Sequence, residues 1–202
     1  MGRVIGVTGG IATGKSTVMN IFARLGARTL SADAVAREVL AKGGICYQQT
    51  IQRFGEEIVG IDGEIDRATL GGIIFSDPSA RQDLENITHP HIIAQINRQI
   101  EEFRADSANV DHVLAVEIPL LVECGLESVV DDVVVVAAEL ETQVCRLTTI
   151  RGISSDEAEL RIKAQMPLDM KIERADWVIW NDGSLESLES QVRAVWDEIR
   201  LP

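Results

Sequence analysis

The stretch "GVTGGIATGKSTV", residues 6–18, places four glycines and a lysine between an apolar run and a segment with helical periodicity. Gly9, Gly14, Lys15 and Ser16 match the spacing G-x-x-x-x-G-K-[ST]. Glycines at this spacing let backbone amides turn toward a phosphate without obstruction from side chains. The helix that follows directs the positive end of its dipole at the same anion. The stretch therefore predicts a loop that binds the triphosphate of a nucleotide.

The whole loop and the first residues after it are the expected nucleotide contacts: Gly10, Ile11, Ala12, Thr13, Gly14, Lys15, Ser16 and Thr17. Lys15 is expected to reach the β- and γ-phosphates and to take part in catalysis, while Ser16 is the expected ligand of Mg²⁺. A flexible turn that merely contains a lysine is the alternative. An apolar strand before the loop and an amphipathic helix after it favour the phosphate site.

The composition is that of a globular protein, with 46% apolar, 25% charged and 4% aromatic residues among 202. A formal net charge of −13 disfavours nucleic acid and anionic membranes as partners, so a phosphate site must be built locally. The longest apolar run, near 133–138, is too short to span a bilayer, and the N-terminus shows no secretory signal. Cys46, Cys124 and Cys145 are widely spaced and are interpreted as reduced thiols. We expect a cytoplasmic protein.

Short apolar runs rich in β-branched residues predict strands, several of them apolar on successive residues as in a buried parallel sheet. The predicted strands are 3–8, 27–31, 112–118, 132–138 and 176–180. Helices are predicted over 15–25, over 89–103 with Pro90 near the start, and over 184–199. Alternating strands and helices predict an α/β fold: a doubly wound parallel sheet of about five strands, like that of P-loop nucleoside triphosphate hydrolases.

The chain is interpreted as a single P-loop kinase domain, residues 1–202, with three parts. The core comprises 1–32, 111–145 and 167–202, a helical acceptor-binding insertion covers 33–110, and a small lid covers 146–166. A capping-box pattern from Ser154 to Glu157 begins the lid helix. A phosphate loop, an acceptor-binding insertion and an arginine-bearing lid are what a small-molecule kinase requires.

Other P-loop classes fit the sequence less well. A GTPase carries D-x-x-G and N-K-x-D elements, and the sequence has neither. A partner-driven ATPase carries an aspartate at the end of a strand, where this chain offers only Glu117. The sequence therefore favours a kinase.

The segments "TGGIATGKS", "SADAVAREV", "THPHI", "IPLLVE", "RIKAQMP" and "ADWVIWNDGSLESLESQV" together resemble the dephospho-coenzyme A kinase family. The resemblance covers nearly the whole chain, and "PLLVE" and "RIKAQMP" are more selective than the phosphate loop. It implies transfer of the γ-phosphoryl of ATP to the ribose 3′-hydroxyl of dephospho-coenzyme A, the last step of coenzyme A synthesis. The implied partners are small molecules only, ATP with Mg²⁺ and dephospho-coenzyme A. A monomer is compatible with the sequence, which does not determine the oligomeric state.

Two other functions stay open at this point. The first is another nucleoside or nucleotide kinase with the same fold and a different acceptor. The second is a non-catalytic module that senses nucleotide.

Asp33 is a candidate catalytic and substrate-binding residue at the carboxyl end of a predicted strand. A carboxylate there is suited to take the proton of the acceptor hydroxyl or to hold a water on Mg²⁺. Capping of the next helix is the alternative. The family has Asp-Ala-Asp where this chain has Ser31-Ala32-Asp33, which puts any role of the first aspartate in doubt.

The resemblance places Glu123, with Pro119 and Leu120, near the acceptor, whereas a solvated surface glutamate is the alternative for Glu123. His89, before Pro90, is also assigned to the acceptor side, and a histidine that merely starts a helix is its alternative.

Arg161 is the candidate lid arginine, placed to meet transition-state charge on the transferred phosphoryl. A surface ion pair with Glu157 is the alternative. Arg146, which is also assigned to nucleotide binding, and Arg151 are weaker candidates for the lid arginine. The family has Arg-Asp-Gly before the lid helix where this chain has Ile150-Arg151-Gly152.

Asn181, with Gly183, resembles the family stretch beside the adenine, with an ordinary turn as the alternative. Within the phosphate loop, the family has Gly-Ser where this chain has Ala12-Thr13. Because alanine is comfortable only at negative φ, we expect a loop conformation that permits this.

Overall fold

The structure, a computed structural model, describes residues 2–109 and 112–200. The chain forms two compact units, which are described separately: a core unit, residues 1–31 and 102–202, and a helical unit, residues 32–101. In the described part of the chain, no helix has the length and apolar character that a membrane span requires.

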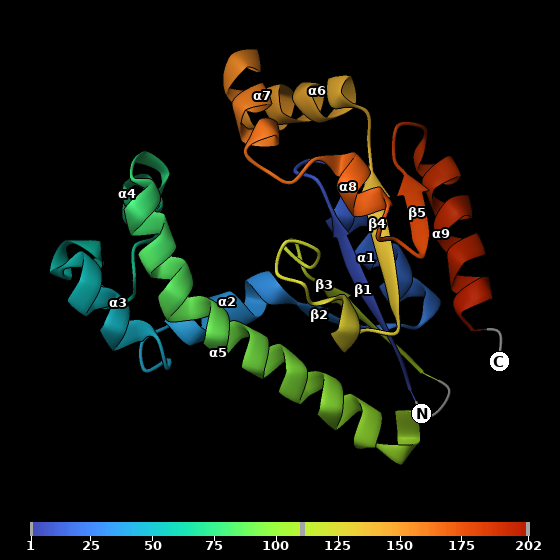
Figure 1. The fold of residues 1–202 in the computed structure, drawn as a ribbon, viewed down its shortest axis with the longest axis horizontal. Helices are drawn as coiled ribbons and strands as arrows, with labels where there is room; N and C mark the ends of the chain where they lie inside the picture. Colours follow the sequence, from blue (N-terminus) through green and yellow to red (C-terminus); the bar gives the residue numbers. More distant parts are fainter. Residues whose placement is uncertain (1, 110–111, 201–202) are drawn as a thin grey trace. The chain divides into compact units, whose positions relative to one another are not determined.

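A sheet of five parallel strands forms the centre of the core unit (Figure 1). The strands are β1 (Arg3–Gly9), β2 (Arg28–Ser31), β3 (Val113–Glu117), β4 (Asp132–Ala137) and β5 (Trp177–Trp180). Each of the five predicted strands is confirmed to within one residue at either end. The order β2-β3-β1-β4-β5 makes β1 the central strand, so the loop at its carboxyl end lies at the middle of the sheet edge. Ligands of open α/β sheets bind at this edge.

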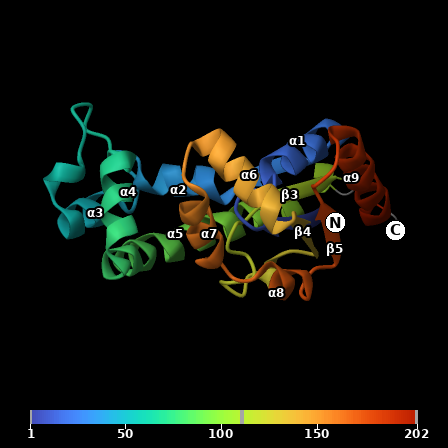
Figure 2. The same cartoon turned by 90° about the horizontal axis from the view of Figure 1, so that it is seen from above.

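Two helices that the sequence predicts cover one face of the sheet. The helices of the core unit are α1 (Lys15–Leu25), α6 (Leu140–Arg151), α7 (Ser155–Lys163), α8 (Leu168–Ile172) and α9 (Leu185–Ile199), with short 3-10 turns at η2 (Ser107–Asn109) and η3 (Glu127–Val129). Helices α1 and α9 share one hydrophobic core with the strands, in which Phe22 and Trp196 lie with ring centroids 6.2 Å apart. Figure 2 shows α1 and α9 on one side of the sheet and α8 on the other.

The ends of α1 and α9 follow local rules of helix capping. Gly26 ends α1 at φ 109°, where its amide donates to the carbonyl oxygens of Phe22 and Ala23. Ser184 begins α9, and its hydroxyl accepts a hydrogen bond from the amide of Ser187 at 3.2 Å. The sequence therefore predicts both helices closely, because their end signals and apolar stripes agree.

The helical unit has a small core of its own. Its elements are α2 (Ala32–Leu40), α3 (Tyr47–Phe54), the 3-10 turn η1 (Glu56–Ile58), α4 (Arg67–Ser76) and most of α5 (Pro78–Ala105). Side chains of α3, η1 and α4 pack together there, among them Tyr47, Phe54, Ile58 and Leu70. Cys46 is also buried in this unit, and burial raises the pKa of its thiol. None of the three cysteines forms a disulfide bond in the described part of the chain, and Cys124 and Cys145 are exposed.

The predicted start of the long helix near Pro90 is wrong. Helix α5 begins twelve residues earlier, at Pro78, and Pro90 lies inside it. Proline at a first helical position is favourable, and Asp77 before it accepts a hydrogen bond from the amide of Ser79 at 2.8 Å. Ala80, only 2% exposed, anchors the extra turns in the helical unit. This tertiary packing offsets the hydrogen bond that Pro90 cannot donate.

Candidate active site

The phosphate loop spans Gly9–Gly14, from the last residue of β1 to the residue before α1. Two of its motif glycines have no room for a side chain. A Cβ on Gly9 (φ 147°) would lie 2.2 Å from the carbonyl oxygen of Val136, and one on Gly14 (φ 94°) would lie 2.1 Å from Asn181 Nδ2. The motif glycines are thus required by close backbone and side-chain neighbours as well as by the phosphate they are expected to face.

Ala12 departs from the expectation for this loop. Its φ of 59° lies in the left-handed region, and it is the only non-glycine residue with positive φ among residues 2–109 and 112–200. The expectation of a loop that keeps Ala12 at comfortable φ is therefore wrong. The turn between Gly9 and Gly14 places the backbone at position 12 in the left-handed region, although the residue there is alanine and not glycine.

Lys15 folds over the loop that precedes it. Its ammonium group donates to the carbonyl oxygens of Gly9 at 3.1 Å and Gly10 at 2.7 Å. With these carbonyl dipoles neutralised, the positive potential of the loop amides and of the α1 N-terminus predominates. Ser16 and Thr17 follow in the first turn of α1 with exposed side chains.

Arg146 and Asn181 hold the other side of the phosphate loop. Arg146, on α6, donates from Nη1 to the carbonyl oxygens of Ala12 (3.1 Å) and Thr13 (3.3 Å) and from Nη2 to that of Asn181 (2.6 Å). Asn181, just after β5 and 9% exposed, donates from Nδ2 to the carbonyl of Thr13 at 2.8 Å. Both side chains support the loop backbone, and their contact with nucleotide stays a prediction. Asn181 is therefore more than an ordinary turn residue, because its side chain binds the backbone of the phosphate loop.

The lid segment reaches the same loop through Gln165, which follows α7. The amide of Ile11 donates to Gln165 Oε1 at 2.7 Å. Helix α7 begins as the capping pattern predicts, because the Ser154 hydroxyl accepts from the amide of Glu157 at 3.2 Å. The predicted start of the lid, residue 146, falls inside α6, so no helix boundary marks it.

Arg161 lies on α7 beside Glu157 and forms the ion pair that was the alternative to a catalytic role. Nη2 of Arg161 donates to Glu157 Oε1 at 2.7 Å, and the two side chains are 30% and 39% exposed. Such an i,i+4 ion pair contributes little to the free energy of folding, so the guanidinium can exchange Glu157 for another partner at small cost. Arg151 is exposed at the last position of α6.

Glu123 lies in a different environment from the solvated surface that was its alternative, and that alternative is wrong. Its Oε1 is 2.6 Å from the Nζ of Lys171, a side chain on α8 with 1% exposure. The same ammonium donates to the carbonyl oxygen of Pro119 at 3.3 Å, and Thr8 Oγ1 donates to that oxygen at 3.1 Å. The Pro119–Glu123 segment is thereby attached to β1 and to α8, with Leu120 half-buried within it.

Asp33 and His89 belong to the helical unit. Asp33 is exposed in the first turn of α2, two residues after the end of β2, so it is not the N-cap residue that the alternative assumed. His89 lies inside α5, and the interpretation of a histidine that starts a helix is wrong. Their places at the site stay predictions.

Sequence reasoning missed four polar residues that build the site: Thr8, Gln143, Gln165 and Lys171. Gln143 is 4% exposed, and its Oε1 would lie 3.0 Å from a Cβ on Gly10. Two of them lie in segments that carry the family resemblance, Thr8 in "TGGIATGKS" and Gln165 in "RIKAQMP". Lys171 and Gln143 look like ordinary polar positions of amphipathic helices.

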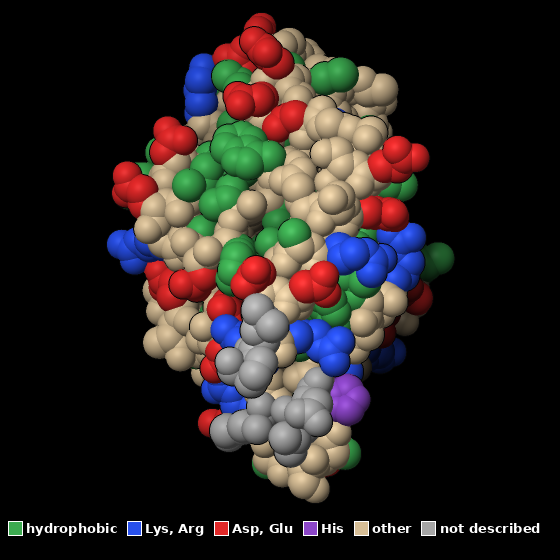
Figure 3. Space-filling view, turned by 90° about the vertical axis from the view of Figure 1, so that its right-hand side faces the viewer, with side chains coloured by type: hydrophobic (Ala, Val, Ile, Leu, Met, Phe, Trp, Pro, Cys, Tyr) green, Lys and Arg blue, Asp and Glu red, His purple; other side chains and the backbone are tan. Residues whose placement is uncertain are grey.

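Acidic side chains are frequent on the surface of the molecule, among Lys and Arg side chains (Figure 3). Figure 3 shows Asp and Glu side chains spread over much of one face of the molecule, in keeping with the net charge of −13. Among the described residues, no group of three His, Cys, Asp or Glu side chains is arranged to hold a metal ion. A magnesium ion carried in by triphosphate oxygens needs no such group, and the exposed Ser16 side chain at the α1 N-terminus fits one protein ligand.

These features define a P-loop kinase: a parallel sheet, a phosphate loop at its central strand β1, and helix α6, whose Arg146 is hydrogen-bonded to that loop. The family model for CoaE, dephospho-CoA kinase, matches residues 3–187. The chain belongs to the dephospho-CoA kinase family.

Individual relatives agree with this assignment over nearly the whole chain. A dephospho-CoA kinase from Geobacter metallireducens is 46% identical over 195 residues, 96% of each chain. One from Arabidopsis thaliana is 44% identical over 200 residues, 99% of this chain and 85% of the relative.

Solved structures extend the comparison to the fold. TT1252 from Thermus thermophilus superposes with a TM-score of 0.77 at 37% identity, covering 98% of this chain and 97% of that one. The dephospho-CoA kinase from Campylobacter jejuni gives 0.68 at 29% identity with the same coverage. A shikimate kinase from Bacteroides thetaiotaomicron, at 17% identity and a TM-score of 0.53 with full coverage of both chains, shares the fold alone.

Proposed function

We propose that this chain transfers the γ-phosphoryl of ATP to the ribose 3′-hydroxyl of dephospho-coenzyme A. The observation that carries the proposal is the phosphate loop, whose carbonyl oxygens are bound by Lys15, Arg146 and Asn181, in a chain of this family. Donors on the carbonyl oxygens remove the repulsion that these oxygens would exert on a triphosphate. The loop is therefore arranged to hold an anion in a molecule of net charge −13.

The reaction requires positioning and charge stabilisation more than covalent chemistry by the protein. The acceptor oxygen forms a bond to the γ-phosphorus while the bond from that phosphorus to the β–γ bridging oxygen breaks, and ADP leaves. Asp33 accepts the proton of the hydroxyl. Lys15 neutralises the β- and γ-phosphate oxygens, and Arg161 exchanges Glu157 for the transferred phosphoryl when the lid closes.

Ser16 is the residue we assign to hold Mg²⁺, and its exposed side chain in the first turn of α1 suits a single hydroxyl ligand. The ion supplies charge neutralisation on the triphosphate. Gly10–Thr17 bind the phosphates, and Arg146 and Asn181 keep the loop in shape beside the nucleotide.

The acceptor side is assigned to Glu123, Pro119, Leu120 and His89. The division into a core, a helical acceptor-binding insertion (33–110) and a lid (146–166) belongs to the same proposal, as do a monomeric state and a cytoplasmic location.

An acceptor assay tests the function directly. ADP release in the presence of Mg²⁺ and ATP is measured with dephospho-coenzyme A, adenosine, nucleoside monophosphates and shikimate, and phosphorus NMR identifies the product. We expect kcat/KM for dephospho-coenzyme A to exceed that of the other acceptors by a factor of about 100 or more.

Preference for any other acceptor would contradict the proposed substrate. Lys15→Ala is expected to abolish most of the transfer, since the phosphate charge then lacks its ammonium partner. Transfer that survives this substitution unchanged would contradict the role of the loop.

A further inference from the structure

Lys171 is a buried lysine that the proposed chemistry does not use. It lies on α8, and its side chain is 1% exposed. Lysine is almost never fully buried unless its charge is paired, because removing an ammonium group from water is costly. An apolar side chain of similar length would fill the same space at lower cost. The charge itself therefore needs an explanation.

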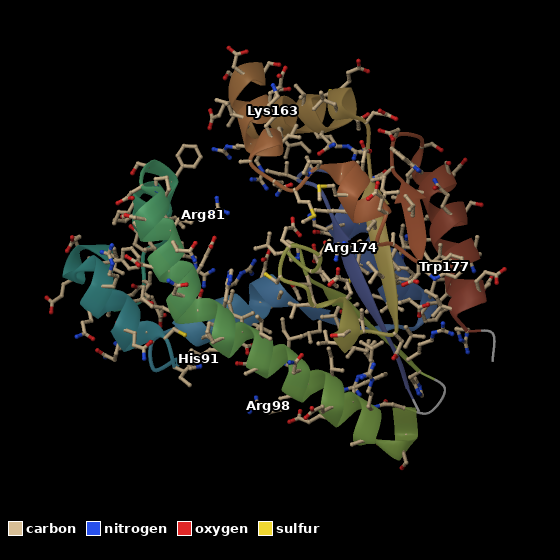
Figure 4. All side chains as sticks on the ribbon, viewed as in Figure 1. Arg81, His91, Arg98, Lys163, Arg174 and Trp177 are labelled. Carbon is tan, nitrogen blue, oxygen red and sulfur yellow. The ribbon has the colours of Figure 1, made fainter. Side chains whose placement is uncertain are left out.

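The ammonium group of Lys171 has two partners in one short segment. It lies 2.6 Å from Glu123 Oε1 and donates to the carbonyl oxygen of Pro119 at 3.3 Å. Both ends of the Pro119–Glu123 segment are thus held from one atom. Arg174, labelled in Figure 4, lies three residues further along the chain. It forms a more exposed ion pair, with Glu127.

The same segment is attached to the phosphate loop's strand. Thr8, fully buried near the end of β1, donates from Oγ1 to the carbonyl of Pro119 at 3.1 Å. The Pro119 carbonyl therefore accepts from β1 on one side and from α8 on the other. These two hydrogen bonds hold Pro119, at the start of the Pro119–Glu123 segment, to both β1 and α8.

The Glu123 side chain is less buried than that of its partner Lys171. It is 19% exposed, compared with 1% for Lys171, but both of its carboxylate oxygens are buried. Among the described residues these oxygens have no hydrogen-bond partner, so beside the ion pair with Lys171 they keep the capacity to accept hydrogen bonds from an acceptor substrate. A carboxylate in this position needs a counter-charge, because an anionic acceptor would otherwise be repelled. A lysine buried beneath it supplies that charge without competing for the acceptor.

We infer that Lys171 is a positioning residue for the acceptor, acting through Glu123 and the Pro119 carbonyl. It orients the Glu123 carboxylate for hydrogen bonding to acceptor hydroxyls and offsets its negative charge. The inference rests on the proposed function, because it assumes that the Pro119–Glu123 segment meets dephospho-coenzyme A.

Steady-state kinetics of Lys171→Met separates this role from a structural one. We expect KM for dephospho-coenzyme A to rise roughly tenfold to a hundredfold, while KM for ATP changes by less than about twofold. Arg174→Met is the matched control, since Arg174 joins Glu127 at 3.0 Å between the same two parts of the chain but is 60% exposed. We expect the control to leave both KM values within about twofold of the wild type.

A double-mutant cycle with Glu123→Gln tests whether Lys171 acts through Glu123. We expect Lys171→Met to change KM for dephospho-coenzyme A by less than about twofold when residue 123 is already glutamine. Additive effects of the two substitutions would overturn the inference, as would an equal rise in both KM values.

The apolar pair Lys171→Met/Glu123→Leu covers the case in which the single variant does not fold. Replacing both charges by apolar groups removes the unpaired carboxylate, so this variant is expected to retain the wild-type Tm. A raised KM for dephospho-coenzyme A in the folded double variant supports the inference, and a wild-type KM overturns it. Inactivity of the wild-type enzyme toward dephospho-coenzyme A would contradict the proposed function instead, so the two failures are distinguishable.

Discussion

Single residues of the phosphate loop show where its backbone geometry is demanding. Gly9 and Gly14 have positive φ and no space for a Cβ, whereas Ala12 has positive φ and a Cβ. The left-handed region costs an alanine about 1 kcal/mol or more. The loop keeps this strain because Arg146 and Asn181 hold the carbonyl oxygens of Ala12 itself and of Thr13, the next residue.

Substitution of Ala12 by glycine is expected to stabilise the protein. Relief of the left-handed strain outweighs the added freedom of glycine in the unfolded chain, for a net gain of up to about 1 kcal/mol in the free energy of unfolding. Urea denaturation measures it. Ala23→Gly, at an exposed position of α1, is the control and is expected to cost about 0.5–1 kcal/mol. A loss of stability in Ala12→Gly would show that the left-handed conformation of Ala12 costs the folded protein less than the freedom that glycine adds to the unfolded chain.

Asp33→Asn tests the proposed proton acceptor. The amide keeps the shape of the side chain but does not accept the proton, so kcat is expected to fall by about 100-fold or more while ATP affinity is retained. Asp156→Asn, in the first turn of α7, is the control for loss of a negative charge at a helix start. If Asp33→Asn loses thermal stability and keeps its turnover, the carboxylate serves α2 and not the chemistry.

At the scale of elements, the helix starts at the lid and in the helical unit depend on single side chains. Ser154 begins α7, and Asp66 begins α4 by accepting from the amides of Ala68 and Thr69. The sequence predicted the Ser154 cap but made no prediction at Asp66, which follows the same local rule because a cap acts only over its own first turn.

Ser154→Ala is expected to loosen the lid helix locally. The loss of one capping hydrogen bond costs about 1 kcal/mol, so amides of α7 should exchange with deuterium about fivefold faster while those of α9 are unchanged. Ser155→Ala, one residue later and without a capping bond, is the matched control. Equal protection in both variants would mean that tertiary contacts, and not the cap, hold α7.

Asp66 gives the helical unit a defined dependence on pH. Hydrogen bonds from the Thr69 hydroxyl and from the amides of Ala68 and Thr69 lower the pKa of its carboxyl from the ordinary value of 3.8. A lowered folded-state pKa means that the carboxylate stabilises the fold above the unfolded-state pKa. This stabilisation is lost as the pH falls through the folded-state value.

An NMR titration of the Asp66 carboxyl measures that effect. In Thr69→Val the largest contribution is removed, and we expect the pKa of Asp66 to rise toward its ordinary value. The wild type should then lose its stability advantage over Thr69→Val as the pH falls below the ordinary carboxyl range. Identical titrations in the two proteins would contradict this cause.

At the scale of the whole core unit, Arg3 joins parts of the chain that are distant in sequence. Its Nε and Nη2 donate to the two carboxylate oxygens of Asp132 at 2.8 and 3.0 Å, and Nη1 donates to the carbonyl of Ile199 at 2.7 Å. The hydrogen bond with Asp132 raises the pKa of the Arg3 guanidinium. One side chain thereby connects β1, β4 and the end of α9.

Arg3→Met is expected to lower the free energy of unfolding by about 2 kcal/mol, because Asp132, whose side chain is 9% exposed, loses a bidentate partner. Arg3→Lys should recover only part of this, since an ammonium cannot reproduce the planar fork. Arg24→Met, which removes an exposed pair with Glu189, is the control and is expected to stay within about 0.5 kcal/mol. Chemical denaturation followed by tryptophan fluorescence measures all three variants. Equal effects of Arg3→Met and Arg24→Met would show that the Arg3 network adds nothing.

Local signals in the sequence were enough for the five strands, for α1 and α9, and for the motif of the phosphate loop. These features depend on neighbours within a few residues: apolar periodicity, caps and the glycine spacing. The sequence did not predict the start of α5. That start depends on whether the packing of Ala80 outweighs the hydrogen bond that Pro90 cannot donate, and local sequence signals do not show tertiary packing.

The polar partners of the site became visible only in the folded chain. Lys171 and Glu123 are 48 positions apart in the numbering, Ile11 and Gln165 are separated by 154, and Arg3 and Asp132 by 129. No periodicity or motif relates such positions, because the fold alone brings them within hydrogen-bonding distance. The sequence by itself thus determined the phosphate-loop motif, whereas the groups that hold the loop and pair with Glu123 are set by how the strands and helices pack.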